Sequence, residues 1–121
     1  MVARPVYKIC SRAEWDAALY VGRFEGSAAD RRDGFIHLSD RSQVVETAAR
    51  HFSGQHGLVL VAFDAEALGP ALRWEPSRQG ALFPHHYGPL PAAAARWVEP
   101  LPLDRAGDHR FPARFAHDRM R

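Results

Sequence analysis

LVLVAF, residues Leu58–Phe63, is the stretch that decides the fold of this chain. Six successive apolar residues, mostly branched or aromatic, predict a strand that is covered on both faces, because a half-exposed strand alternates apolar and polar residues. We expect this strand at the centre of a sheet. It is the longest apolar stretch and far too short to cross a bilayer, and no leader with a cleavage site precedes it, so we expect neither membrane insertion nor export.

Shorter strands and two helices surround this stretch. The expected strands are PVYKIC (5–10), GFIHLS (34–39), LRWE (72–75) and ARWVEP (95–100). The first helix begins at Ser11, which can form a capping box with Glu14, and ends at Gly22. Two early helices among short, sequential strands predict an α+β fold with a small, mostly antiparallel split sheet.

Apolar spacing predicts which residues each helix buries. In the first helix we expect these to be Trp15, Ala18, Leu19 and Val21. The second helix is expected from about Ser42 to Phe52, with Ser39 or Asp40 as its cap. Its expected inward residues are Val44, Val45, Ala48, Ala49 and Phe52. The segment RFEGSAADRRD (23–33) is expected to be a loop.

The charge of the chain is unevenly distributed. We expect one globular domain over residues 1–103 and a basic tail over residues 104–121. Of 16 Lys and Arg and 14 Asp and Glu, the tail holds five arginines and three aspartates, so the 11 basic and 11 acidic residues of the domain cancel. Because the domain has no excess positive charge, DNA is not an expected partner. RNA is not excluded as a ligand. We expect the tail to be solvated.

A single cysteine, Cys10, excludes an internal disulfide and fits a reducing compartment, so we expect the protein in the cytoplasm. Because Cys10 lies in an expected strand without a neighbouring base, we interpret it as a buried thiol rather than a nucleophile. The sequence also lacks the G-x-G-x-x-G, P-loop and G-x-S-x-G motifs, which removes the commonest nucleotide-binding and hydrolase classes.

Polar side chains interrupt two of the expected strands. Alternation in GFIHLS places His37 and Ser39 on one face, opposite an aliphatic pair, and a polar patch is more suggestive of a site than one isolated histidine. Glu75 follows Trp74 and precedes a proline, so one side of its carboxylate is expected to be sheltered. A sheltered carboxylate either pairs with a cation or has its pKa raised, and both states are useful in catalysis.

FPHHYGPL (83–90) gathers two histidines and a tyrosine among prolines. The prolines predict a rigid loop rather than a core strand, and a ligand meeting such a loop loses little entropy in ordering it. If the segment is extended, His85 and His86 point to opposite sides, so only one of them is expected to face a site. Tyr87 and Trp74 offer flat surfaces on which a base or a nicotinamide ring could stack.

Zinc held by His37, Glu75 and His85 would be chemically acceptable and would support metal-assisted hydrolysis. The sequence has none of the close ligand spacings that make a zinc site convincing. We therefore predict no metal.

Five segments, YKI, DGFIHLS, LVLVAFD, LRWEPS and FPHHYGPLP, resemble in order and spacing one family of bacterial proteins, domain of unknown function 952. The resemblance runs from about Val6 to Leu101. The family has no settled activity, so the resemblance implies a common fold without implying a reaction.

GFIHLS also resembles the V-H-L-S strand of the RNA 2′-phosphotransferases, which have the ADP-ribosyltransferase fold. That resemblance implies an ADP-ribosyltransferase-like fold, in which a small sheet is split around a cleft where NAD lies bent. It implies that His37 faces the cleft and that Glu75 or His85 fills a late polar position. The first-strand position falls on Lys8, where relatives often have histidine. Lysine contacts phosphate only as a point charge.

The same resemblance implies roles for the candidates. Cleavage of the nicotinamide–ribose bond develops oxocarbenium character, which a carboxylate such as Glu75 would stabilise. His37, with Arg73 or Arg32, would hold the pyrophosphate.

These expectations lead to one main hypothesis and one alternative. The main hypothesis is a cleft that binds NAD or a related phosphorylated nucleotide, with ADP-ribosyl or 2′-phosphate transfer as the activity. The alternative is a non-enzymatic binding module, or a homodimer, that uses FPHHYGPL to contact protein; exposed aromatic rings there would favour it. The expected catalytic residues are His37, Glu75 and His85, and the expected nucleotide-binding residues are Lys8, Arg32, Ser39, Arg73, Trp74 and Tyr87.

Overall fold

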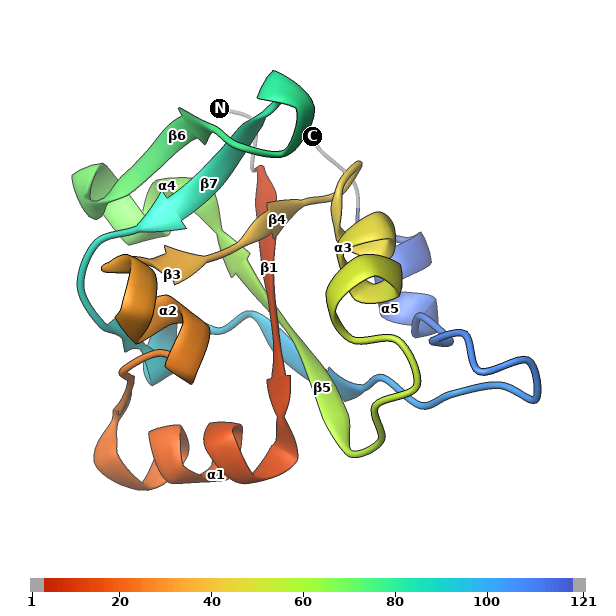
Figure 1. Ribbon diagram of the computed structural model, residues 1–121. Coiled ribbons are helices and arrows are strands. Elements are labelled where there is room, and N and C mark those ends of the chain that lie inside the picture. The colour runs from red at the N-terminus through yellow and green to blue at the C-terminus, as the bar shows by residue number, and fades with distance from the viewer. Residues whose placement is uncertain (1–3, 119–121) are drawn as a thin grey trace.

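The computed structural model describes residues 4–118 and places β5 (Leu58–Asp64) inside a four-stranded antiparallel sheet, as expected (Figure 1). The strand order is β4 (Ser39–Asp40), β1 (Pro5–Ser11), β5 and β9 (Trp97–Pro100). β1 pairs with β5 along its whole length, from Pro5 opposite Asp64 to Ser11 opposite Leu58. The expected α+β class and antiparallel pairing are therefore confirmed.

Both faces of this sheet are covered, which explains the unbroken apolar sequence of β5. One face belongs to a first core cluster, whose members include Val59, Val61, Phe63, Trp15 and Ile36. The other face belongs to a second core cluster, which includes Leu58, Leu60, Ala62, Val44 and Trp97. Alternate residues of one strand thus enter separate cores.

A second, three-stranded antiparallel sheet carries the three expected catalytic residues, His37, Glu75 and His85. Its order is β3 (Ile36–His37), β7 (Leu82–His86) and β6 (Leu72–Pro76). The expectation of a rigid loop at FPHHYGPL is wrong for its first half, because residues 83–86 lie in the central strand of this sheet. A proline fits there because its missing N–H would face the same side as its carbonyl oxygen, which accepts from the Leu38 N–H (3.0 Å) where the pairing of β3 with β7 has ended.

The remaining strands form a small antiparallel pair, β2 (Arg23–Phe24) with β8 (Leu90–Pro91). The helices are α1 (Arg12–Val21), α2 (Ala28–Asp33), α3 (Val44–His51), α4 (Ala65–Leu68) and α5 (Ala113–Ala116). Short 3₁₀ turns lie at η1 (Gly69–Ala71), η2 (Arg78–Gly80) and η3 (Ala92–Ala94). Across residues 4–118 no helix combines the length and the apolar character that a membrane span requires.

α1 begins and ends where the sequence predicts. Ser11 and Glu14 form the expected capping box, and Gly22 closes the helix in a left-handed conformation at φ 97°. The expected apolar face is too wide, however: Trp15 is buried, but Leu19 and Val21 are 56% and 54% exposed. α1 contacts the core through a narrow stripe only.

α3 begins two residues later than expected. The Asp40 carboxylate accepts from the Ser42 N–H (2.9 Å) and so holds a turn before the helix, and the first helical residue is Val44. Neither Ser39 nor Asp40 caps the helix. Val45 and Ala49, expected inward, face solvent.

The segment expected to be a loop between α1 and β3 contains α2. Ser27 accepts from the Asp30 N–H (3.2 Å) and the Asp30 carboxylate accepts from the Ser27 N–H (2.9 Å), which makes a second capping box. The apolar pattern misses this helix because its buried residue is a carboxylate, Asp30.

Within the tail, Phe111, Phe115 and Asp118 pack against the domain, so the expectation of a solvated terminus is wrong for residues 111–118, whereas residues 104–106 are exposed as expected. Phe111 and Phe115 contact the second core cluster. The buried Tyr7 hydroxyl donates to Asp118 at 2.6 Å, and Arg96 forms two hydrogen bonds with the same carboxylate at 2.7 and 3.2 Å. Arg119 and Arg121, two of the five tail arginines, lie outside the described residues.

Candidate functional site

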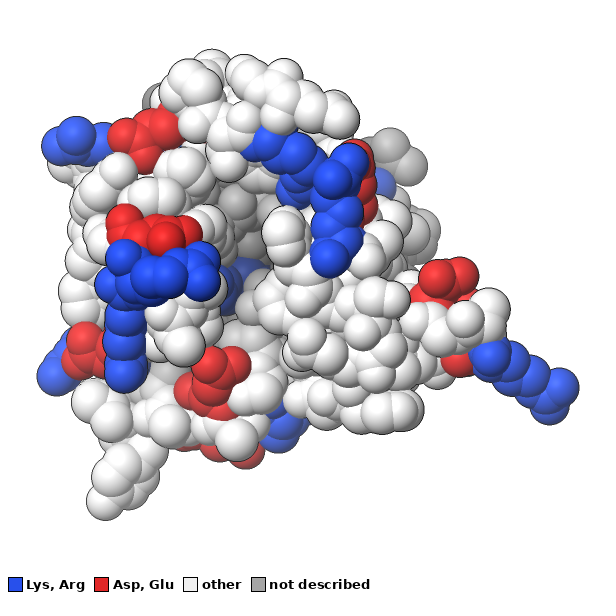
Figure 2. All heavy atoms as spheres, in the orientation of Figure 1, with Lys and Arg blue, Asp and Glu red and all other residues white. Residues whose placement is uncertain are grey.

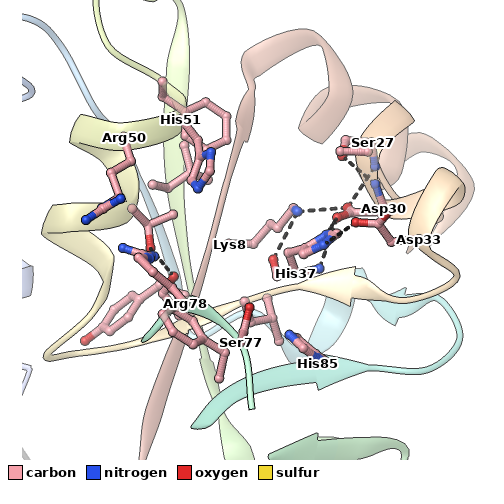
Figure 3. A pocket seen from close by; sticks show the side chains of 18 of the residues that line it. Lys8, Ser27, Asp30, Asp33, His37, Arg50, His51, Ser77, Arg78 and His85 are labelled. Atoms are coloured by element: carbon pink, nitrogen blue, oxygen red, sulfur yellow. Dashed lines mark hydrogen bonds and ion pairs between the residues drawn. The ribbon is translucent and has the colours of Figure 1, made fainter. Parts of the chain in front are cut away.

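A cavity of about 840 Å³ opens between α2 and α3. Its floor comes from β1, from the β3–β4 segment and from β7, and η2 closes one end beside α3 (Figure 3). The space-filling view shows a hollow in this face, with basic side chains gathered on two sides of it (Figure 2). The charged lining residues are Lys8, Arg32, Arg50 and Arg78 and the carboxylates Glu14, Asp30 and Asp33.

Asp30 is the centre of the hydrogen bonds on the α2 side. Its Oδ2 accepts from Lys8 Nζ (2.8 Å), and its Oδ1 pairs with the backbone N–H and the Nδ1 of His37 (3.0 and 2.7 Å). Burial raises the pKa of Asp30, but the hydrogen bond from His37 and the charge of Lys8 outweigh it and hold the pKa well below its usual range. Asp30 is therefore a fixed negative charge at the base of the cavity.

Lys8 lies at the floor with its side chain only 5% exposed. Besides Asp30, its ammonium group contacts the carbonyl oxygen of His37 at 3.1 Å. The expected phosphate contact would therefore come from an ammonium group whose charge a carboxylate already balances. Lys8 orders the floor of the cavity as well as lining it.

His37 lies between two carboxylates. Its Nδ1 is 2.7 Å from Asp30, its Nε2 is 2.9 Å from Asp33, and its side chain is 38% exposed to the cavity side. A ring nitrogen must carry a proton to bond a carboxylate, so both contacts form together only when the ring is an imidazolium. Both ring nitrogens of His37 thus face carboxylates, and the contact of Nδ1 with Asp30 is a hydrogen bond.

His85 lies beside His37, with 5.9 Å between the ring centroids, but has different partners. Its Nδ1 is 2.8 Å from Glu75 Oε1, and the Tyr87 hydroxyl donates to the same oxygen at 2.8 Å. The hydrogen bonds from His85 and then from Tyr87 lower the pKa of Glu75, and the bond to Glu75 raises the pKa of Tyr87. His85 thus links the cavity to a carboxylate behind it.

The opposite wall is basic and rich in hydroxyl groups. Arg78 donates to Thr47 Oγ1 (2.8 Å) and lies 3.7 Å from Glu46, whose other partner is Arg50 (2.7 Å). Ser39 contacts the same Thr47 hydroxyl at 2.9 Å. Figure 3 shows Arg50, His51 and Arg78 on this wall, across the cavity from Asp30 and His37.

The structure brings together some of the residues that the sequence singles out. Lys8, Arg32, His37, Ser39 and His85 line the cavity. The lining does not include Arg73, Trp74, Glu75 or Tyr87. Glu75 still reaches the site through His85, and Arg73 lies over the Tyr87 ring at 5.1 Å.

Trp74 alone points elsewhere. It alternates with Arg73 and Glu75 along β6, packs against the first core cluster and has the Arg4 guanidinium 3.6 Å from its ring centroid. Trp74 therefore offers no stacking surface to this cavity. Of the two histidines in FPHHYGPL only His85 lines the cavity, as expected, while His86 Nδ1 contacts the Gly88 carbonyl oxygen (2.8 Å).

Sequence reasoning missed the acidic residues Asp30 and Asp33 and the basic residues Arg50 and Arg78. The sequence did contain one signal for Asp30. Ser27 followed three residues later by Asp30 fits the N-terminal capping pattern of a helix, although it precedes no apolar run. The arginines carry no such signal, because they come from segments that only tertiary packing brings to the cavity.

Metal binding and nucleophilic attack by a thiol find little support in the described residues. Among residues 4–118 no group of three or more His, Cys, Asp or Glu side chains is arranged to hold a metal ion. Cys10 is buried, as expected, and burial followed by the nearby Glu14 raises the pKa of its thiol to about 12, so a thiolate is not available near neutral pH.

Comparison with known proteins gives a family and close structural relatives. Residues 9–98 match the family described as protein of unknown function (DUF952). The crystal structure of protein CC0527 from Caulobacter crescentus is 54% identical with a TM-score of 0.88, covering 93% of this chain and 98% of that one. The solution NMR structure of CC0527 gives a TM-score of 0.79 at 54% identity, covering 93% and 95%. No curated protein matches the chain. The matched family covers most of the sequence and every lining residue of the cavity except Tyr7 and Lys8, and the chain belongs to the DUF952 family.

Proposed function

We propose that the cavity between α2 and α3 binds NAD or a related phosphorylated nucleotide. The observation that carries the proposal is the arrangement of charge: Arg50 and Arg78 on one wall and Arg32 on the other, over a floor where Lys8 is hydrogen-bonded to Asp30. Guanidinium groups suit phosphate because they offer paired donors in a plane. A volume of about 840 Å³ lies within the usual range for small-molecule sites.

The carboxylates of the α2 wall suit the ribose and nicotinamide groups of such a ligand. Asp33 and Asp30 present negative charge around His37, and Ser27 lies beside them. Carboxylates can accept from ribose hydroxyl groups and can stabilise a cationic nicotinamide ring or an oxocarbenium ion. The residues present therefore fit NAD with its phosphates toward α3 and its ribose toward α2.

ADP-ribosyl or 2′-phosphate transfer is the activity we propose for this site. The support is the resemblance of GFIHLS to the strand of the RNA 2′-phosphotransferases, together with the position of His37 in the cavity. Glu75, expected near the ribose, stands behind His85 instead, so the carboxylates nearest a bound ribose would be Asp30 and Asp33. We expect the ligand to come from the cytoplasmic nucleotide pool, with RNA as one acceptor to test.

A homodimeric interaction module is the second candidate. Its expected surface, FPHHYGPL, supports it only through Tyr87, which is 37% exposed, since Phe83 is 7% exposed and lines the cavity. The observation in its favour is on α1, where Leu19, Tyr20 and Val21 are 56%, 94% and 54% exposed. Light scattering of the parent and of Tyr20→Ser would detect a dimer that depends on this face.

Calorimetric titration with NAD, ADP-ribose, ADP and a 2′-phosphorylated RNA oligonucleotide tests the nucleotide proposal. We expect Arg78→Gln to weaken binding about tenfold or more, because a hydrogen bond to a charged group contributes roughly 1.5–3 kcal/mol. Arg31→Gln is the control, since Arg31 is an exposed arginine of α2 that does not line the cavity. A thermal-shift screen adds sensitivity, because a ligand at 100 times its Kd stabilises by about 2.7 kcal/mol.

Two results would contradict the proposal. One is the absence of binding for all four ligands. The other is equal loss of affinity in Arg78→Gln and Arg31→Gln, which would point to general electrostatic attraction rather than to this wall.

A further inference from the structure

Two of the three histidines that line the cavity, His37 and His85, have carboxylate partners that assign them opposite proton-transfer roles. His37 has a carboxylate at each ring nitrogen, Asp30 at 2.7 Å and Asp33 at 2.9 Å. Each ring nitrogen thus faces a carboxylate of the cavity wall, so neither is turned toward a ligand as a proton acceptor. His85 has a carboxylate at Nδ1 only.

The partner of His85 fixes its tautomer. The pKa of Glu75 is lowered, first by the hydrogen bond from His85 and then by that from Tyr87, so Glu75 is ionised near neutral pH and can only accept. His85 Nδ1 must then be the donor in the 2.8 Å contact. In a neutral imidazole with a protonated Nδ1, the lone pair is on Nε2.

The His85 imidazole is held by stacking on one face and by a hydrogen bond at Nδ1. Phe35 stacks on His85 with 4.0 Å between centroids and an interplanar angle of 23°. Behind the ring, the Tyr87 hydroxyl donates to the same Glu75 oxygen, and Arg73 lies over the Tyr87 ring. β-sheet pairing sets Arg73 opposite His85 and Glu75 opposite Phe83, so alternate positions of β6 and β7 place Arg73, Glu75 and His85 on one face of the sheet.

His85 Nε2 has access to the cavity. His85 lines the cavity, and no hydrogen bond to its Nε2 occurs among residues 4–118. Within the same residues no fully buried side-chain nitrogen or oxygen lacks a partner, so this nitrogen is in contact with solvent-accessible space. The lone pair of Nε2 is therefore accessible, on a residue that lines the cavity.

We propose that His85 Nε2 is the proton acceptor of this cavity, acting on a hydroxyl group, with Glu75 and Tyr87 as its positioning residues. The inference rests on the proposed function and deepens it. The hydroxyl O–H bond breaks, the proton moves to Nε2, and the electron pair stays on the oxygen. That oxygen bonds to C1′ of the NAD ribose while the bond to nicotinamide breaks and its electron pair leaves with the ring, as neutral nicotinamide. Glu75 stabilises the imidazolium that forms.

Water is the simplest hydroxyl donor, so nicotinamide release from NAD is the activity to measure. We expect His85→Ala to lower kcat by about 10²–10⁴-fold, the usual contribution of a general base, with NAD affinity by calorimetry unchanged. Added imidazole should restore part of the rate in His85→Ala, which a merely structural role would not allow. His56→Asn is the control, because His56 is exposed and does not line the cavity.

Long-range ¹H–¹⁵N NMR tests the positioning residues without any ligand. In the parent, neutral His85 should be protonated at Nδ1, and Glu75→Leu should return the ring to a mixture of tautomers. Glu75→Leu should also lower kcat while leaving KM unchanged. Tyr87→Phe, which removes a single hydroxyl from a side chain that is 37% exposed, provides a variant that keeps the fold. It should lower kcat by less than Glu75→Leu does, because the bond between Glu75 and His85 remains.

The outcomes separate this inference from the proposed function. A parent protein that binds NAD but has His85 protonated at Nε2 when neutral, or releases no nicotinamide, overturns the inference and leaves the binding proposal standing. The inference is likewise overturned if His85→Ala releases nicotinamide as fast as the parent. Failure of the parent to bind NAD overturns both.

Discussion

At the scale of single residues, Asp30 explains why a lysine can stand inside an otherwise apolar strand. Lys8 has 4% of its surface exposed, and its neighbours in β1 belong to the two cores. A buried ammonium group is tolerated only when it is paired and hydrogen-bonded. Asp30 supplies that pairing, and the same carboxylate orients His37, so one residue of a six-residue helix fixes two side chains of the cavity.

Asp30→Asn is therefore expected to reduce stability strongly. Removing one partner of a buried ion pair costs about 3–5 kcal/mol, because the remaining charge stays buried. Because the pKa of Asp30 is lowered in the folded state, its contribution is complete above the unfolded value near pH 4 and is lost as the pH falls below it. The difference between parent and variant in urea unfolding should be largest at neutral pH and should shrink below about pH 4. Asp16→Asn, whose side chain is 60% exposed, is the control, and an equal effect in both variants would contradict this role.

At the scale of secondary-structure elements, α1 and α2 begin with the same kind of capping box, but α1 packs on a core and α2 faces the cavity. Ser11 with Glu14 begins α1, and Ser27 with Asp30 begins α2. The first was predicted, because it precedes an apolar stripe. The second was missed, because the acidic partner of its box is itself the buried residue, and the helix faces a cavity instead of a core.

The two caps give a matched pair of variants. Ser11→Ala and Ser27→Ala should each lower the free energy of unfolding by about 1 kcal/mol, the usual cost of losing a serine cap. Only Ser27→Ala should also weaken ADP-ribose binding in calorimetry, because Ser27 lines the cavity and Ser11 does not. Ser53→Ala, at an exposed position, is the control for the substitution itself. Equal loss of affinity in both cap variants would mean that stability, rather than the α2 wall, governs binding.

At the scale of the whole molecule, the C-terminal segment closes the second core. Tyr7, from the first strand, is 1% exposed and donates to Asp118, 111 positions away. Phe115 packs on the Tyr7 ring with 5.3 Å between centroids, and Arg41 donates to the Phe115 carbonyl oxygen. A segment with net positive charge thus attaches through its aromatic residues and through an aspartate.

Asp118→Ala should therefore destabilise the whole domain. Loss of the acceptor leaves the buried Tyr7 hydroxyl unsatisfied, which costs about 1–3 kcal/mol. Tyr7→Phe should cost less, because Asp118 keeps its bonds with Arg96, and the double variant should cost less than the sum of the two. Thermal unfolding of the three variants measures this coupling. The exposed Asp108→Ala is the control, and strict additivity would show that the two groups do not interact in solution.

The raised pKa of Tyr7 predicts how the stability of the fold changes at alkaline pH. Burial, followed by the hydrogen bond to Asp118, raises the pKa of Tyr7 above its ordinary value of about 10. The folded state then keeps the phenol proton that the unfolded chain releases. This contribution to stability is complete below about pH 10 and is lost as the pH rises beyond it.

The sequence alone determined the class of this fold and where several of its elements begin and end. Unbroken apolar residues from Leu58 to Phe63 require a doubly covered strand, and Ser11, Glu14 and Gly22 set the limits of α1 by bonds within a few residues. Strand alternation, which is a local property, also put His37 and Ser39 on one face of GFIHLS, and both residues line the cavity.

Only the tertiary structure decided the rest. FPHHYGPL was expected to be a loop, and its first half became a central strand because β3 and β6 pair with both of its sides. The partners of Lys8, His85 and Tyr7 stand 22, 10 and 111 positions away. The physical reason is range: caps, turns and alternation act between near neighbours along the chain, whereas burial, ion pairing and the choice of tautomer depend on which distant groups the fold brings within about 3 Å.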